Sequence, residues 1–159
     1  MRITEILDLS NIIVQLNAEN KEAALNTMIN SLENSSKVEN INKVRTAILE
    51  REKLMSTGVG HGFAIPHGKT DGVNDITAVF ATCASPIAFD SLDNQPVNIL
   101  FMLVAKETQV GTHLKMLSRI SRLMNSVEFR EKVVAVSTQE EILELLRNEE
   151  DKYFENTPS

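Results

Sequence analysis

Residues that could carry chemistry gather in one stretch of the sequence, Arg51–Lys69. The stretch contains two histidines, His61 and His67, and most of the glycines of the chain. Pro66 fixes its own φ angle and restricts the residue before it, so His67 is expected on a rigid segment. A neutral imidazole has a lone pair on one ring nitrogen, so it can attack an electrophilic phosphorus or act as a base. We therefore take His67 as the candidate reactive residue.

Two further side chains could hold the negative charge of a phosphoryl group. Arg51 is predicted at the end of a helix, and a guanidinium can bind a phosphoryl group through two parallel hydrogen bonds. His113 is predicted at a helix N-terminus, where unpaired backbone N–H groups favour an anion. Each residue has a plainer interpretation as well. Arg51 could pair with an acidic surface residue, and His113 could be an exposed first-turn residue beside a capping Thr112.

The glycine-rich loop before His67 offers hydroxyl and backbone N–H groups, as an anion-binding nest does. We predict a phosphate-binding loop formed by Ser56, Thr57, Gly58, Gly60 and Gly68. Gly68, which has no side chain, is expected to let another molecule approach the backbone beside the reactive histidine. The Gly-Lys-Ser/Thr ending of a P-loop is missing, so nucleotide binding is not predicted.

Three histidines also raise the alternative of a zinc site, since His61 and His67 could converge with His113. The sequence lacks the His-x-x-His, Cys-x-x-Cys and His-Glu-x-x-His patterns of zinc ligands, so neither a metal nor another cofactor is predicted. His61 is expected to be an exposed loop residue. The single cysteine, Cys83, excludes an internal disulfide and is expected to be a buried thiol in an apolar run.

Size and composition indicate one globular domain. The chain has 159 residues, of which 42% are hydrophobic and 24% charged. Its net charge of −6 argues against a nucleic-acid binder. The N-terminus lacks the apolar core of a signal peptide, and the longest apolar run, Val97 to Ala105, is too short to span a bilayer, so a cytoplasmic protein is predicted. We assign residues 1–150 to the domain and expect an acidic, solvated chain from Asn148, with 151–159 as a frayed tail.

The elements that must position these residues alternate between strands and helices. Apolar, β-branched runs predict strands at 12–16, 76–83 and 97–105. Phe63–His67 is expected to be extended, at a sheet edge or leaving the sheet, because Pro66 cannot donate a ladder hydrogen bond. Helical periodicity predicts helices at 21–32, 40–55, 109–125, 127–134 and from 139 onward, with Leu54, less regularly, and Leu114 on inner faces. The fold class is therefore α/β, a mixed sheet of four to five strands flanked by helices.

The stretch Arg51–Lys69 resembles the active-site signature of the fructose/mannitol class of enzyme IIA domains in the bacterial phosphotransferase system. The segment from Pro86 to Val97 is most similar to the nitrogen-regulatory branch of that class, and the helix that begins at Thr112 fits as well. The resemblance extends from about Ile3 to Arg147, nearly the whole predicted domain. His61 departs from it, since relatives often have Asn there, and this change could alter partner contacts.

The resemblance implies a phosphotransferase/anion-transport-like sandwich and a phosphohistidine mechanism. His67 would accept a phosphoryl group from the phosphocarrier HPr or its nitrogen-branch counterpart, and Arg51 and His113 would contact the phosphoryl oxygens. Membership of the nitrogen branch implies regulation through phosphorylation-dependent binding of target proteins. The nearest alternative is a sugar-specific IIA that passes phosphate to a IIB domain.

Two alternatives of other classes are a binding module whose His67 is never phosphorylated and a metal-dependent hydrolase built on the three histidines. No nucleic acid is expected as a partner. The chain itself is not expected to be an integral membrane protein.

Overall fold

The structure is a computed structural model that describes residues 1–154. Its strands are β1 (Ile12–Leu16), β2 (Gly58–Gly60), β3 (Phe63–Ala64), β4 (His67–Lys69), β5 (Thr77–Ile87) and β6 (Val97–Ala105). Its α-helices are α1 (Lys21–Asn30), α2 (Ile41–Leu54), α3 (Val110–Met124), α4 (Val127–Ala135) and α5 (Gln139–Phe154), and short 3-10 turns occupy η1 (Ile3–Glu5) and η2 (Leu9–Asn11). All the predicted helices are present.

The strands of the described residues form one mixed sheet in the order β1-β5-β6-β3-β2, with β4 also paired to β6. β5 is antiparallel to β6, whereas β3 and β4 both run parallel to it. The predicted mixed sheet with flanking helices is confirmed. It has six strands in this part of the chain, rather than four to five, because the glycine loop pairs as β2 and Pro66 divides the predicted extended segment into β3 and β4. The Pro66 carbonyl still accepts the Leu103 N–H, at 2.9 Å.

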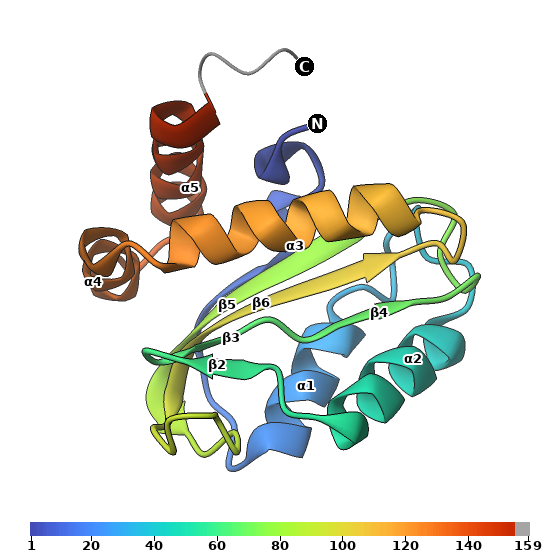
Figure 1. The fold of residues 1–159 in the computed structure, drawn as a ribbon, viewed down its shortest axis with the longest axis horizontal. Helices are drawn as coiled ribbons and strands as arrows, with labels where there is room; N and C mark the ends of the chain where they lie inside the picture. Colours follow the sequence, from blue (N-terminus) through green and yellow to red (C-terminus); the bar gives the residue numbers. More distant parts are fainter. Residues whose placement is uncertain (155–159) are drawn as a thin grey trace.

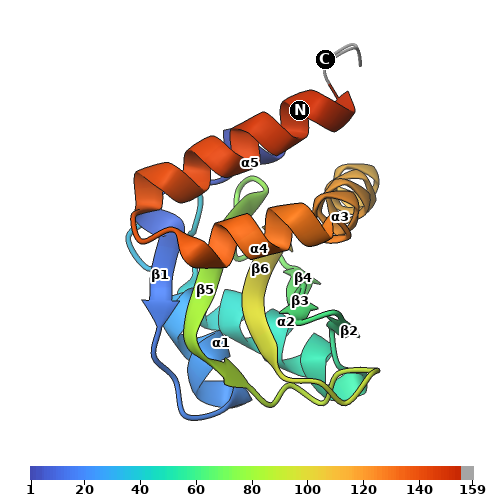
Figure 2. The same ribbon diagram turned by 90° about the vertical axis from the view of Figure 1, so that its left-hand side faces the viewer.

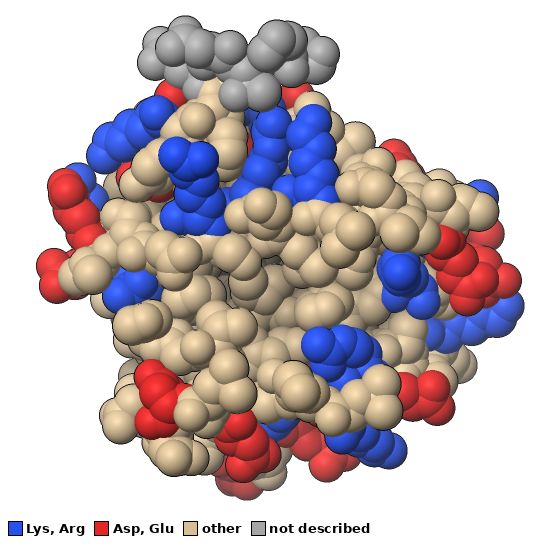
Figure 3. Space-filling model, viewed as in Figure 1, with Lys and Arg blue, Asp and Glu red and all other residues tan. Residues whose placement is uncertain are grey.

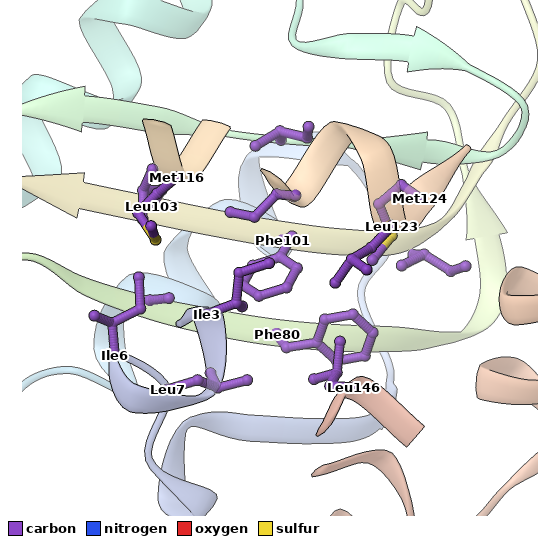
Figure 4. Packing of buried hydrophobic residues seen from close by; sticks show 14 of the residues in the cluster. Ile3, Ile6, Leu7, Phe80, Phe101, Leu103, Met116, Leu123, Met124 and Leu146 are labelled. Carbon is purple, nitrogen blue, oxygen red and sulfur yellow. The ribbon is translucent and has the colours of Figure 1, made fainter. Parts of the chain in front are cut away.

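Helices cover both faces of the sheet. α1 and α2 lie on one face, and α3, α4 and α5 lie on the other (Figures 1 and 2). The central strand β6 is buried on both sides, since alternate side chains belong to two different apolar clusters. Phe101 and Leu103 lie on the face that α3 covers. They belong to one apolar cluster with Met116 of that helix and Ile3 of the N-terminal turn (Figure 4). The strands that carry the site are therefore held by burial from both directions.

Helix α2 is delimited by local signals. The Asn40 side chain accepts the N–H groups of Asn42 and Lys43, at 3.1 and 3.2 Å, which caps the first turn. Arg51 and Lys53 lie in the last turn, where cations complement the negative end of the helix dipole. The helix packs against β4, so its C-terminal turn comes next to the histidine of that strand.

The C-terminal part of the chain corrects the prediction of a solvated tail from Asn148. Helix α5 continues to Phe154, and Glu150 is completely buried. The Glu150 carboxylate accepts the N–H groups of Ile3 and Thr4, at 2.6 and 2.9 Å, and Arg2 pairs with Asp151. Glu150 therefore caps the N-terminal turn from a buried position, and the half-exposed Asp151 pairs with Arg2 beside it. The expected tail at 155–159 lies outside the described residues. None of the helices within residues 1–154 is long and apolar enough to cross a membrane.

Glu150→Ala should lower the free energy of unfolding by about 2–4 kcal/mol, because it leaves two backbone donors without acceptors in a buried place. Urea unfolding followed by circular dichroism measures the change. Glu144→Ala is the matched control, since Glu144 makes an exposed ion pair with Arg147 on the same helix and should cost less than about 0.5 kcal/mol. Equal losses in the two variants would contradict the capping role of Glu150.

Candidate phosphoryl-transfer site

A pocket of about 860 Å³ lies where α2, β4 and the first turns of α3 meet. Figure 3 shows that this face of the molecule is hollowed near its middle, with Lys and Arg side chains along parts of the rim. His67 and Arg51 line the pocket together with His113, from three different elements. Gly68 lines it as well. The other lining residues are Ala47, Glu50, Lys53, Leu54, Lys69, Leu114 and Leu117.

His67 is held in one tautomer by a backbone carbonyl. Its Nδ1 lies 2.7 Å from the carbonyl oxygen of Ile65. A carbonyl can only accept, so Nδ1 carries the proton and Nε2 keeps the lone pair. Burial lowers the pKa of His67, and the charges of Arg51 and Lys69 lower it further, against the opposing effects of the Ile65 bond and of Glu52. The ring is therefore mainly neutral at pH 7, with Nε2 as its nucleophilic atom.

His113 is buried, with 5% of its surface exposed. The alternative of an exposed first-turn residue is therefore wrong. Its ring centroid lies 5.4 Å from that of His67, and its Nε2 has no hydrogen-bond partner among residues 1–154. Burial, and then the charges of His67 and Lys69, lower the pKa of His113 to about 4. A buried ring nitrogen without a partner is costly, so its position next to His67 points to a polar group that arrives from outside.

Arg51 belongs to the last turn of α2, and its Nη1 donates to the Met55 carbonyl at 2.8 Å. None of the ion pairs among the described residues includes Arg51, so the alternative of an acidic surface partner is not observed there. Its charge reaches His67, whose pKa it lowers. Arg51 thus brings a cation, without an acidic partner among the described residues, to the pocket that His67 lines, where it can offset negative charge.

Of the five residues predicted to form a phosphate-binding loop, Gly68 alone lines this pocket. Ser56, Thr57, Gly58 and Gly60 are all absent from the pocket lining. The N–H and hydroxyl groups of Thr57 donate to Glu52, at 2.8 and 2.7 Å. The Gly58 N–H donates to the Ser56 hydroxyl oxygen, at 3.1 Å. These groups are used within the protein and are not available to a ligand.

Gly68 also has a role in the packing of helix α2. A Cβ atom at this position would lie 3.2 Å from the carbonyl carbon of Ala47 and 3.3 Å from its Cβ, in helix α2. The missing side chain therefore allows α2 to pack closely on β4. This packing brings Arg51 to the pocket that His67 lines. Gly68 also lines the pocket, and the approach of another molecule to its backbone stays a prediction.

Sequence reasoning missed the pocket residues Lys69, Leu54 and Leu114 as parts of the site. Lys69 follows Gly68, and its charge lowers the pKa of both pocket histidines. Leu54 and Leu114 were predicted to face inward, but they are 82% and 61% exposed. The imperfect helical period of Leu54 was the one signal in the sequence that could have indicated an outward position.

His61 lies apart from the other two histidines. It has a φ of 58° and its N–H donates to Asp93 at 3.0 Å, in an exposed turn that does not line the pocket. Over residues 1–154, no three His, Cys, Asp or Glu side chains come close enough together to hold a metal ion. Cys83 is partly buried, and burial raises the pKa of its thiol to about 11.

His113 should take up a proton only near pH 4, well below the ordinary histidine pKa of about 6.5, because burial disfavours the charged ring. NMR titration of the imidazole signals measures this midpoint. His67→Ala should raise it, since a positive charge next to His113 is removed. Ser118→Ala, on the exposed side of α3, should leave it unchanged. A wild-type midpoint near 6.5 would contradict the buried position.

Comparisons with known proteins agree on one family. The sequence model of "Phosphoenolpyruvate-dependent sugar phosphotransferase system, EIIA 2" matches residues 5–149. The chain is 34% identical over 152 residues to the fructose-specific EIIABC component of Bacillus subtilis, covering 96% of this chain but only 24% of that relative. It is 36% identical over 146 residues to a nitrogen regulatory protein of Bradyrhizobium diazoefficiens, covering 92% of this chain and 95% of the relative.

Solved structures show the same similarity. The crystal structure of the nitrogen regulatory protein IIA-Ntr from Neisseria meningitidis superposes with a TM-score of 0.83 at 35% identity, over 91% of this chain and 98% of that one. The residues that the family model matches, 5–149, include all the residues that line the pocket. The chain therefore belongs to the type 2 enzyme IIA family of the phosphoenolpyruvate-dependent sugar phosphotransferase system.

Proposed function

We propose that this enzyme IIA protein is a phosphoryl carrier that accepts a phosphoryl group on Nε2 of His67 from a phosphohistidine of HPr or of its nitrogen-branch counterpart. The observation that carries the proposal is the 2.7 Å contact between His67 Nδ1 and the Ile65 carbonyl. It supports Nε2 as the atom with the lone pair, in a pocket that also contains Arg51 and His113. A purely binding role would not require this fixed tautomer.

In the proposed transfer, the Nε2 lone pair of His67 forms a new N–P bond while the P–N bond of the donor breaks. The electron pair of the broken bond returns to the donor imidazole. Nδ1 keeps its proton throughout, and its hydrogen bond to the Ile65 carbonyl strengthens as the ring gains positive charge. No proton has to move during the step, which suits a pocket where burial lowers the pKa of both histidines.

The transferring group carries spread negative charge, so its stabilisation is electrostatic. Arg51 and Lys69 supply cations at the pocket. His113 remains neutral at pH 7, since burial lowers its pKa to about 4. Its Nε2 has no partner among the described residues, and it can donate a hydrogen bond to a phosphoryl oxygen when that nitrogen carries the proton. Residues from α2, β4 and α3 thus act together on one group.

The surface around the pocket supports a protein as the donor. Leu54, Met55 and Leu114 are exposed large apolar side chains, with exposed fractions of 82%, 64% and 61%. Two of them line the pocket itself. Exposed apolar side chains gathered at a reactive group indicate a surface that a partner covers. An HPr-like carrier would present its phosphohistidine to His67 and bury this rim.

Within the family we favour the nitrogen-regulatory branch over sugar transport. The nitrogen regulatory protein IIA-Ntr superposes with a TM-score of 0.83 at 35% identity, compared with 0.76 at 25% for the mannitol IIA of Escherichia coli. Length does not separate the branches, since a fructose-specific EIIA component of Haloferax volcanii is matched over 94% of its length, much like the 95% of the Bradyrhizobium nitrogen regulatory protein. Phosphorylation would add a charge of roughly −1.5 to −2 beside the apolar rim, which can change the binding of a regulated target. The alternative is a sugar-specific, fructose- or mannitol-type IIA that passes phosphate to a IIB domain, and the fructose-specific relative favours it.

Incubation with phosphoenolpyruvate, enzyme I and a phosphocarrier should attach one acid-labile phosphate to the wild-type protein and none to His67→Ala. His113→Ala and Arg51→Ala should slow labelling by roughly a hundredfold or more, because each removes one preorganised group that stabilises the transferring charge. Single-turnover transfer from radiolabelled carrier measures these rates.

His61→Ala is the matched histidine control and should label like the wild type, since His61 does not line the pocket. Full labelling of His67→Ala, or no labelling of the wild type by any carrier, would overturn the proposed function.

The two branches differ in the expected donor. Parallel single-turnover rates with HPr and with its nitrogen-branch counterpart should show at least a tenfold preference for the latter, because complementary surfaces mainly set association rates between related partners. A preference for HPr, together with onward transfer to an isolated IIB domain, would instead support the sugar-specific alternative.

A further inference from the structure

A buried carboxylate, Glu52, lies directly after Arg51 in the last turn of α2. It is 7% exposed. Its two oxygens accept the Thr57 N–H at 2.8 Å and the Thr57 hydroxyl at 2.7 Å. Lys21, at the start of α1, forms an ion pair with it at 2.8 Å. Glu52 does not line the pocket, so it cannot touch a transferring group directly.

Glu52 and its partners connect four segments of the chain, namely the start of α1, the end of α2, the loop at Ser56 and Thr57, and the segment around Phe89. Lys21 also lies over the ring of Phe89, 4.5 Å from its centroid. The Ser56 hydroxyl donates to the Phe89 carbonyl at 2.6 Å. In Figure 1, the first turn of α1 and the last turn of α2 lie at the lower edge, where the chain leaves for β2. One carboxylate therefore fixes how the loop leaves the helix that carries Arg51.

A short path of hydrogen bonds leads from Glu52 to the reactive histidine. Glu52 holds Thr57, and the Thr57 carbonyl accepts the Ile65 N–H at 3.1 Å. The Ile65 carbonyl then accepts the Nδ1–H of His67 at 2.7 Å. The position of Thr57 thus determines where the Ile65 carbonyl lies, and that carbonyl selects the tautomer.

We propose that Glu52 is a positioning residue for phosphoryl transfer: through Thr57 and Ile65 it holds His67 in the Nδ1–H tautomer, with Nε2 as the nucleophile. This inference rests on the proposed function of His67. Glu52 also contributes its charge, because it opposes the lowering of the pKa of His67 by burial and by nearby cations. A more basic Nε2 is a better nucleophile, so the two effects act in the same direction.

A purely structural role explains the arrangement less well. A buried ion pair adds little net stability compared with apolar residues of similar volume, so stability alone does not call for a carboxylate here. A carboxylate is needed to accept two hydrogen bonds from one residue while it pairs with a lysine. The contacts of Glu52 with Thr57 and Lys21 therefore require a carboxylate in this position, and removal of that carboxylate should change the tautomer and the reactivity of His67.

The test compares Glu52→Gln with Glu22→Gln, which removes the same charge from an exposed position on α1. Glu52→Gln should slow single-turnover phosphorylation by about ten- to a hundredfold, the cost of a misplaced reacting group. Imidazole ¹⁵N shifts should change from a dominant Nδ1–H tautomer of His67 to a mixture. The pH at which the rate falls on acidification should move lower, because a negative charge that raises the pKa of His67 is gone. Glu22→Gln should change none of these.

Thr57→Val is the second variant, because it keeps the charge of Glu52 and removes only the hydroxyl anchor. It should slow transfer severalfold and shift the tautomer ratio while the pKa of His67 stays in place, and it carries the test if Glu52→Gln does not fold. The inference would be overturned if both variants had the transfer rate and the His67 tautomer of the wild type. If Glu52→Gln does not fold, the same result in Thr57→Val alone would overturn it. So would slower transfer with an unchanged tautomer, which would indicate a structural effect only. A wild-type protein that accepts no phosphate would instead refute the proposed function.

Discussion

The site depends on the close contact between helix α2 and strand β4. Gly68 has no side chain, and a Cβ there would lie only 3.2 Å from the carbonyl carbon of Ala47. Because α2 can approach this closely, Arg51 at its last turn reaches the same pocket as His67. β4 is in turn pinned to β6, which is buried on both faces. A larger residue at position 68 would push the helix away and separate the cation from the nucleophile.

The electrostatic state of the pocket follows from burial. Burial keeps both histidines neutral near pH 7, since it lowers the pKa of each. Arg51 and Lys69 remain charged at the same pocket, and each lowers the pKa of His67. The pocket therefore combines a neutral nucleophile with positive charge, an arrangement that suits a phosphoryl group and that water-exposed histidines would not provide.

Most of the secondary structure could be predicted because its signals are local. Asn40 caps α2, continuous apolar runs mark β5 and β6, and helical spacing marks α3. The predictions that were wrong concerned contacts between distant residues. The Thr57 donor in the loop is occupied because Glu52 accepts its N–H, and the acidic end of the chain is packed because Glu150 accepts the N–H of Ile3. Charge alone does not reveal whether a carboxylate is buried.

The sequence by itself determined the candidate residues His67, Arg51 and His113, the order of the elements and the mixed α/β class, through local motifs and periodicity. The tertiary structure alone decided that His113 is buried 5.4 Å from His67, measured between ring centroids, and that Ser56, Thr57, Gly58 and Gly60 do not line the pocket. It also decided which nitrogen of His67 carries the proton and which keeps the lone pair, through the Ile65 carbonyl. The reason is physical: a residue's type sets what chemistry it can perform, whereas burial and hydrogen-bond partners, which come from packing across the chain, set its pKa and its tautomer.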